Sequence, residues 1–231
     1  MSQSRVCAIL LAAGSGSRMK LDKTKQTLRI RGKSVLLRSL EAFEICDKIT
    51  DIILVVKEDE LDFAYSEAKG ILKLRSVVVG GKSRLESAQN GFSHIDFPCD
   101  FVAVHDAARC LILPEKITRV VDDAIRYGAA SASSTVVDTV KRVDDFGFVL
   151  GTEKRESLRL AGTPQIFRYD LYSKAIHSVD IDDAGITDDN MLMEKIGVSV
   201  YMTDVGKDNI KITHAEDLLL AEYLLDRGNN D

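Results

Sequence analysis

Short apolar runs rich in β-branched residues alternate with amphipathic segments along the first half of the chain. The runs at residues 6–11, 52–56, 77–79 and 101–104 predict strands, and the segments at 34–43, 84–92 and 115–126 predict helices. This alternation favours a Rossmann-like α/β fold, a mostly parallel sheet with helices on both faces. Ligands of such sheets bind beyond the carboxyl ends of the strands. The pattern therefore directs attention to the loops after Leu11, Val79 and Val104.

The pattern changes between residues 136 and 160. Two short β-type runs, 139–143 and 148–150, flank a turn at Asp144-Asp145-Phe146-Gly147 and predict a projecting β-arm over about residues 137–160. A two-stranded ribbon is marginally stable alone, so we expect the arm to pack on a second subunit.

The last third of the chain returns to the helical pattern. Helices are predicted at residues 169–179, 188–196 and 214–225, with a strand at 198–203. There is no internal repeat and no sign of a second core, so residues 1–231 are expected to form a single domain.

Composition and charge argue against several classes of partner and site. The net charge of -5 with scattered basic residues favours neither a nucleic-acid partner nor a membrane surface. The four cysteines, Cys7, Cys46, Cys99 and Cys110, are far apart and predict neither a zinc site nor a disulfide framework, which fits a cytoplasmic setting. No apolar stretch approaches the roughly 20 residues that cross a bilayer.

A first loop, after Leu11, carries Gly14, Gly16, Arg18 and further lysines up to Lys25. Its backbone N–H groups can approach a phosphate chain while the cations neutralise the phosphate charge. It is not a dinucleotide fingerprint, because Met19 stands where the last glycine is required. The alternative is a flexible surface loop with solvated lysines.

A second loop, residues 80–83, reads Gly-Gly-Lys-Ser and ends like a P-loop, although Ser76 stands where that motif needs its first glycine. With Lys82, Arg84 and Ser87 it could contact a base, ribose or phosphate. An ordinary turn with a helix cap is the alternative.

A third loop, residues 105–109, places Asp106 and Arg109 just beyond a predicted strand. Asp106 could hold Mg²⁺ against substrate phosphates, and Arg109 could bind a phosphate. The alternative is an Asp106–Arg109 salt bridge at the strand end.

Later polar motifs are weak individually: Thr139 in DTVK, Arg155, Thr163 in TPQ, Thr187 in TDD and Lys211 in NIKIT. Thr187 also fits the N-cap of the following helix. No Ser or Cys lies in a recognisable nucleophile elbow, so covalent catalysis is not indicated. Glycine backbone, cations and one metal-binding aspartate suit direct phosphoryl or nucleotidyl transfer.

Taken in order, LAAGSGSRM, TKQ, GGKSRLES, VHDAAR, DTVK, GTPQIF, ITDD and DNIKITHAEDL resemble the 2-C-methyl-D-erythritol 4-phosphate cytidylyltransferase family of the non-mevalonate isoprenoid pathway. The resemblance spans nearly the whole chain. It implies a fold of the nucleotide-diphospho-sugar transferase type. It also implies that an oxygen of methylerythritol phosphate attacks the α-phosphorus of CTP and releases pyrophosphate.

The resemblance also implies roles for single residues. Arg18, Lys25 and Lys211 would stabilise the transition state, and Asp106 would hold Mg²⁺ or another divalent cation. The positions that match CTP contacts are Ala12, Ala13, Gly14, Ser15, Gly81, Lys82 and Ser87. Those that match contacts of the second substrate are Asp106, Arg109, Thr139, Arg155, Thr163 and Thr187, with Thr139 and Arg155 supplied by the arm of the partner in a homodimer.

Two positions depart from the family pattern, because Thr24 and Cys110 stand where proline is usual. Neither change removes a charge, so a reduced rate or altered inhibitor sensitivity is expected rather than loss of activity. Two other functions stay open at this point. The chain could be a ribitol-5-phosphate cytidylyltransferase, or a non-catalytic nucleotide-binding module that kept the fold.

Overall fold

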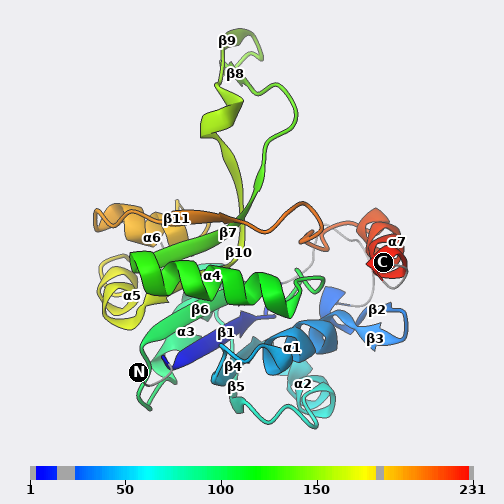
Figure 1. Ribbon diagram of the computed structural model, residues 1–231. Helices are drawn as coiled ribbons and strands as arrows, with labels where there is room; N and C mark the ends of the chain where they lie inside the picture. Colours follow the sequence, from blue (N-terminus) through cyan, green and yellow to red (C-terminus); the bar gives the residue numbers. More distant parts are fainter. Residues whose placement is uncertain (1–3, 15–23, 181–184, 229–231) are drawn as a thin grey trace.

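The computed structural model describes residues 4–14, 24–180 and 185–228, and its centre is a seven-stranded sheet (Figure 1). The strand order is β11-β7-β10-β6-β1-β4-β5. Every neighbouring pair is parallel except the two that involve β10, which runs antiparallel to β6 and β7. The strands are β1 (Val6–Leu11), β4 (Asp51–Val56), β5 (Leu74–Val79), β6 (Phe101–Asp106), β7 (Ala129–Thr135), β10 (Arg159–Arg168) and β11 (Tyr201–Asp204). The prediction of a mostly parallel α/β sheet is confirmed.

Helices cover both faces of this sheet, which explains why its central strands read as continuous apolar runs. Alternate residues of β1 point to opposite faces: Ala8 and Leu10 join the core beneath α1, α2 and α4, whereas Cys7 and Ile9 join the core beneath α3, α5 and α6. The helices are α1 (Val35–Ile45), α2 (Leu61–Glu67), α3 (Arg84–Ser93), α4 (Pro114–Tyr127), α5 (Tyr169–Ile176), α6 (Asp189–Lys195) and α7 (Glu216–Gly228).

Two small hairpins and three 3-10 helices complete the described structure. Strands β2 (Arg29–Ile30) and β3 (Lys33–Ser34) form one hairpin, which packs with α7, and the short helices are η2 (Lys25–Thr27), η3 (Glu58–Glu60) and η4 (Arg155–Ser157). None of the helices within the described residues is both long enough and apolar enough to cross a membrane. The four cysteines are free.

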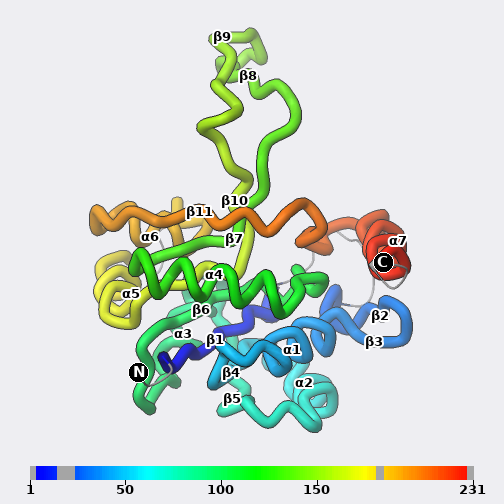
Figure 2. Tube along the Cα trace, in the orientation of Figure 1, coloured from blue at the N-terminus to red at the C-terminus, as the bar shows by residue number. Residues whose placement is uncertain are grey.

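The predicted arm is present and projects away from the body of the molecule (Figures 1 and 2). Its tip is the hairpin of β8 (Lys141–Val143) and β9 (Val149–Thr152), and its base is the pairing of β7 with β10, where Thr135 lies opposite Arg159. Phe146 and Phe148 near the tip are 88% and 71% exposed. The arm thus presents apolar side chains that its own subunit does not cover.

Several boundaries differ from the predictions, and two central strands were missed. Strand β7 consists of alanine, serine and threonine, which carry little hydrophobic signal, although its first five residues are buried. Strand β10 contains Gly162 and Pro164, residues that argue against a strand interior. Strand β5 begins three residues before the predicted start at Val77. Helix α2 and the β2–β3 hairpin were also not predicted.

Candidate active site

A cleft of about 540 Å³ opens at the carboxyl ends of β1 and β6, where the strand pattern directed attention. The first loop contributes Ala13 and Gly14, and Asp106 comes from the end of β6. The second loop and the start of α3 contribute Gly81, Lys82, Ser83, Arg84 and Ser87. Lys25, at the end of the first loop, adds positive charge, as do Lys57 and Lys211 from two further segments. The three loops predicted from sequence therefore meet in one cleft.

Small residues bring the first and second loops together. A Cβ atom added to Gly80 would lie 2.4 Å from the Cβ of Ala13 and 2.9 Å from Oγ of Ser87, so only glycine fits. The backbone N–H of Gly81 donates to Oγ of Ser87 at 3.1 Å. A Cβ on Gly14 would lie 3.5 Å from Nζ of Lys25, which places this ammonium group beside the first loop. Such an arrangement brings backbone and cation to the same anion.

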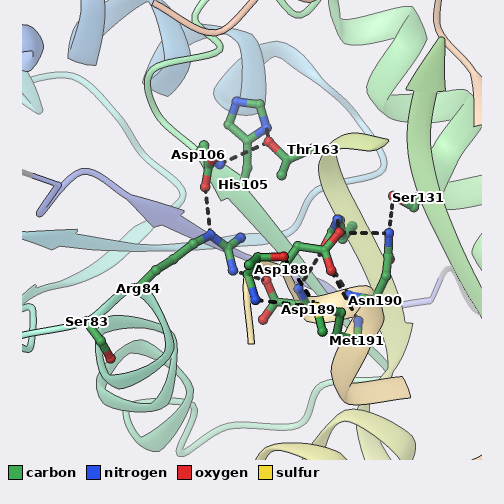
Figure 3. Close-up of polar contacts among 12 residues, drawn as sticks. Ser83, Arg84, His105, Asp106, Ser131, Thr163, Asp188, Asp189, Asn190 and Met191 are labelled. Atoms are coloured by element: carbon green, nitrogen blue, oxygen red, sulfur yellow. Dashed lines mark hydrogen bonds and ion pairs between the residues drawn. The ribbon is translucent and has the colours of Figure 1, made fainter. Parts of the chain in front are cut away.

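Asp106 is the acidic centre of the cleft (Figure 3). Its Oδ1 accepts a hydrogen bond from Nε of Arg84 at 3.1 Å, and its Oδ2 accepts one from Nζ of Lys211 at 2.6 Å. Burial alone would raise the pKa of this carboxyl, but the charges of Arg84 and Lys211 outweigh it and hold the pKa well below its usual range. Asp106 is therefore ionised at physiological pH. The alternative of an Asp106–Arg109 salt bridge is wrong, because Asp106 pairs with these other two cations.

The backbone of Asp106 is held by a hydrogen bond to Thr163, which in turn contacts His105. The N–H of Asp106 donates to Oγ1 of Thr163 at 3.0 Å, and this oxygen lies 3.0 Å from Nδ1 of His105 (Figure 3). The Thr163 hydroxyl therefore links the backbone of Asp106 to the imidazole ring of His105. Complete burial lowers the pKa of His105 to about 3, so the ring is neutral.

Arg84 links Asp106 to a second buried carboxylate. Its Nη1 donates to Oδ2 of Asp189 at 2.6 Å, and the hydroxyl of Tyr172 donates to Oδ1 of Asp189 at 2.7 Å. Asp189 is 1% exposed. Burial alone would lower the pKa of Arg84, but the charges of Asp189 and Asp106 raise it above its ordinary value. Arg84 thus stays charged between two carboxylates.

Gln165 positions the segment that carries Asp189. Its Oε1 accepts the N–H groups of Asp189 at 2.8 Å and Asn190 at 3.2 Å, while its Nε2 donates to Asp188 at 2.8 Å. The Asn190 amide in turn donates to Ser131 at 3.0 Å (Figure 3). The TPQ and TDD motifs, each weak in the sequence, therefore meet in one buried polar network.

Sequence reasoning named Arg84 only as a nucleotide contact and missed the roles of Asp189, Tyr172 and Gln165. The available signal was two polar motifs within otherwise apolar segments. Buried polar groups need partners, so such motifs can be expected to pair with each other.

The remaining predicted residues lie at different distances from the cleft. Ala12, which directly follows β1, is completely buried. Arg109 faces a neighbouring depression and donates to the carbonyl of Asn209 at 2.8 Å. Thr163 is only 4% exposed and supports Asp106 rather than lining the cleft. Ser15 and Arg18 lie outside the described residues.

Three predicted contacts of the second substrate lie away from the cleft of their own chain. Thr187 borders a separate depression, and its hydroxyl contacts the sulfur of Met191 at 3.3 Å. The interpretation of Thr187 as a helix N-cap is wrong, because Asp188 caps α6 by accepting from the N–H of Met191 at 3.2 Å. Thr139 and Arg155 belong to the arm, where Arg155 donates to the carbonyl of Val137 at 2.7 Å.

The cleft suits a divalent cation that arrives with a phosphate ligand. Among the described residues there is no cluster of three or more His, Cys, Asp or Glu side chains that could hold a metal by itself. Asp106 offers one carboxylate, and Mg²⁺ in phosphate-transfer sites is held by one or two carboxylates plus substrate phosphates. The donor set therefore fits Mg²⁺ bound together with a phosphate ligand.

Comparisons with known proteins agree with this geometry. The family model of 2-C-methyl-D-erythritol 4-phosphate cytidylyltransferase matches residues 6–227. Proteins of that name from Clostridium perfringens and Clostridium botulinum are 36% and 35% identical over 227 and 226 residues, covering 96% and 97% of this chain and 99% of each relative.

Solved structures show the same likeness. The crystal structure of 4-diphosphocytidyl-2C-methyl-D-erythritol synthase from Anaerococcus prevotii superposes with a TM-score of 0.87 at 27% identity, covering 97% of both chains. The structure of 2-C-methyl-D-erythritol 4-phosphate cytidylyltransferase from Francisella tularensis superposes with a TM-score of 0.78 at 27% identity, covering 95% of this chain and 99% of the other. The chain belongs to the 2-C-methyl-D-erythritol 4-phosphate cytidylyltransferase family.

Proposed function

We propose that the protein transfers the cytidylyl group of CTP to 2-C-methyl-D-erythritol 4-phosphate. An oxygen of the acceptor phosphate forms a bond to the α-phosphorus of CTP as the bond from that phosphorus to the β-phosphate oxygen breaks, so pyrophosphate leaves. One observation carries this proposal. Glycine backbone, Lys25, Lys211 and Asp106 line a single cleft, as direct transfer between phosphates requires.

The first and second loops would bind the nucleotide. Backbone N–H groups at Ala13 and Gly14 can approach the phosphates closely, and the hydrogen bond from the Gly81 N–H to Ser87 holds the second loop in place. Lys25 and Lys211 would neutralise the charge that builds up on the phosphates during transfer. Arg18, whose structure is not described, would contribute to the same charge stabilisation by family resemblance.

Asp106 would hold Mg²⁺ against the phosphates, and the bound ion would supply further positive charge at the reacting groups. In the described structure Lys211 donates to Asp106. A cation at this carboxylate would compete with that ion pair and leave Lys211 available to a phosphate oxygen.

Direct measurement of pyrophosphate release tests the function. The protein would be incubated with CTP and Mg²⁺, with either methylerythritol phosphate or ribitol 5-phosphate as acceptor. We expect release with methylerythritol phosphate and a loss of at least about 100-fold in kcat/KM for Lys25→Ala. Preference for ribitol 5-phosphate would change the substrate assignment. Absence of pyrophosphate release with both acceptors, despite CTP binding, would identify a non-catalytic nucleotide-binding module.

We also propose that two subunits share each site. The arm projects away from its own body and exposes Phe146 and Phe148, which supports a second copy of the chain as its partner. By family resemblance, Thr139 and Arg155 of one arm would then reach the phosphate and hydroxyls of the acceptor in the other subunit, together with Arg109 and Thr187.

Mixed dimers test the shared site. Arg155→Ala impairs the arm and Lys25→Ala impairs the cleft, so each homodimer should have little activity. A dimer with one subunit of each kind contains one site made from an intact cleft and an intact arm. Coexpression at equal levels should therefore recover about a quarter of the wild-type activity per subunit. No recovery in dimers shown to be mixed would reject the shared site.

A further inference from the structure

Arg84 lines the cleft and pairs with Asp189, a buried residue that does not line it. The guanidinium group of Arg84 is divided between two carboxylates: Nε donates to Asp106 at 3.1 Å and Nη1 donates to Asp189 at 2.6 Å (Figure 3). Asp106 and Asp189 come from different elements, the end of β6 and the start of α6. Arg84 therefore joins two parts of the molecule at one point.

The surroundings of Asp189 allow it little movement. The hydroxyl of Tyr172 donates to its Oδ1, and Gln165 accepts its backbone N–H, both within 2.8 Å. Its side chain is 1% exposed, whereas that of Arg84 is 25% exposed. Asp189 is thus the more rigid of the two residues, and its hydrogen bond to Nη1 restrains the longer side chain of Arg84.

The charges of the cluster indicate that Asp189 does not serve nucleotide binding. Arg84 and Lys211 carry two positive charges, and Asp106 and Asp189 carry two negative charges, so the cluster is neutral before substrate binds. Asp189 weakens the positive potential that an anionic nucleotide would meet. A residue kept only to strengthen nucleotide binding would not be a buried carboxylate at this place.

We propose that Asp189 and Arg84 are positioning residues for the transfer reaction: Asp189 fixes Arg84, and Arg84 holds the carboxylate of Asp106 in its reactive orientation. The inference rests on the proposed function. It assigns the TDD motif a role in orienting the floor of the nucleotide cleft, in addition to any contact that Thr187 makes with the acceptor.

The test is Asp189→Asn, which keeps the shape of the side chain and removes its charge. Mutation of a residue that orients a ligand-binding side chain typically costs 10- to 100-fold in activity, and we expect kcat to fall by about that factor. The cluster would become more positive, so the KM for CTP should stay constant or fall. A lower kcat without a higher KM separates positioning from loss of nucleotide binding.

Asp51 provides a matched control. It is also 1% exposed and pairs with two arginines, Arg5 at 3.4 Å and Arg75 at 2.5 Å, but it lies at the start of β4, the opposite end of the sheet. Asp51→Asn should lower the unfolding temperature while kcat and KM stay within about twofold of the wild type. An equal loss of kcat in Asp51→Asn would show a general effect of destabilisation and overturn the inference.

Two further variants keep the inference testable if Asp189→Asn does not fold. Arg84→Lys retains the charge but cannot bridge two carboxylates, so its kcat should fall similarly. Tyr172→Phe removes only the hydroxyl that fixes Asp189 and should lower kcat by about threefold. Folded variants with wild-type kcat would refute the positioning role. Absence of pyrophosphate release by the wild-type protein would instead contradict the proposed function.

Discussion

The neutral, buried His105 predicts that the protein loses stability as the pH falls through the mildly acidic range. The unfolded chain binds a proton at this residue with a pKa of about 6.5, whereas the folded protein does so only near a pKa of about 3. Between these values the unfolded state holds more protons, so the free energy of unfolding decreases as the pH decreases. The loss begins below about pH 6.5 and continues toward pH 3.

The size of the effect follows from the two pKa values. Each pH unit below 6.5 costs about 1.4 kcal/mol, so His105 alone removes about 2 kcal/mol between pH 7.5 and pH 5. The value at pH 5 depends on the unfolded pKa, because the folded pKa lies well below this range. Asp106 does not contribute in the same window, since its lowered pKa keeps it ionised in the folded protein and an unfolded aspartate, with a pKa of about 3.9, is also ionised above pH 5.

Denaturant unfolding of the wild type and His105→Asn between pH 5 and pH 7.5 measures this contribution. Asparagine keeps a polar group next to the Thr163 hydroxyl but does not titrate, and the loss of the ring contact between His105 and Phe43 is the same at every pH. The other three histidines are common to both proteins. The stability advantage of the wild type should shrink by about 2 kcal/mol at pH 5. An advantage that stays constant within about 0.5 kcal/mol would refute the reasoning.

Other predictions concern backbone and surface. Thr24 has a φ of -69°, and its buried hydroxyl has no hydrogen-bond partner within the described residues, so Thr24→Pro should raise the free energy of unfolding by about 0.4–1 kcal/mol in denaturant titration. Gly91→Ala places a Cβ 2.5 Å from Ile9, away from the cleft, and should cost about 1–3 kcal/mol of stability with an unchanged KM for CTP. Gly80→Ala should lower stability similarly but also raise that KM, which steady-state kinetics would show. Phe146→Asp should shift the protein toward monomer in analytical ultracentrifugation, and an unchanged assembly would remove Phe146 from the proposed interface.

The sequence was sufficient where physical constraints were local. Strand β1 was predicted at its observed bounds because its six residues are all buried and apolar. The meeting of the three loops followed from a general rule, since parallel strands place their carboxyl ends at one edge of the sheet. The projecting arm was predicted from two short β-type runs, 139–143 and 148–150, on either side of a glycine-containing turn.

The parts that could not be predicted depend on partners far apart in the chain. Arg84 and Asp189 are separated by 105 positions, and nothing near either residue indicates the other. Strand β7 was missed because its burial comes from its position in the sheet and not from large apolar side chains. Thr163 was expected beside a substrate, but its hydroxyl is used within the fold.

Strand β10 restricts how the gene for such a protein can change in length. Its pairing with β7 shifts register between Ala161 and Gln165. Within this interval Thr163 accepts the N–H of Asp106, and at its end Gln165 accepts the N–H of Asp189 at the start of α6. Inserting one residue before Thr163 would send the side chains of both Thr163 and Gln165 to the wrong faces of the sheet. Insertions and deletions should therefore accumulate at the tip of the arm, while β10 should vary only by substitution.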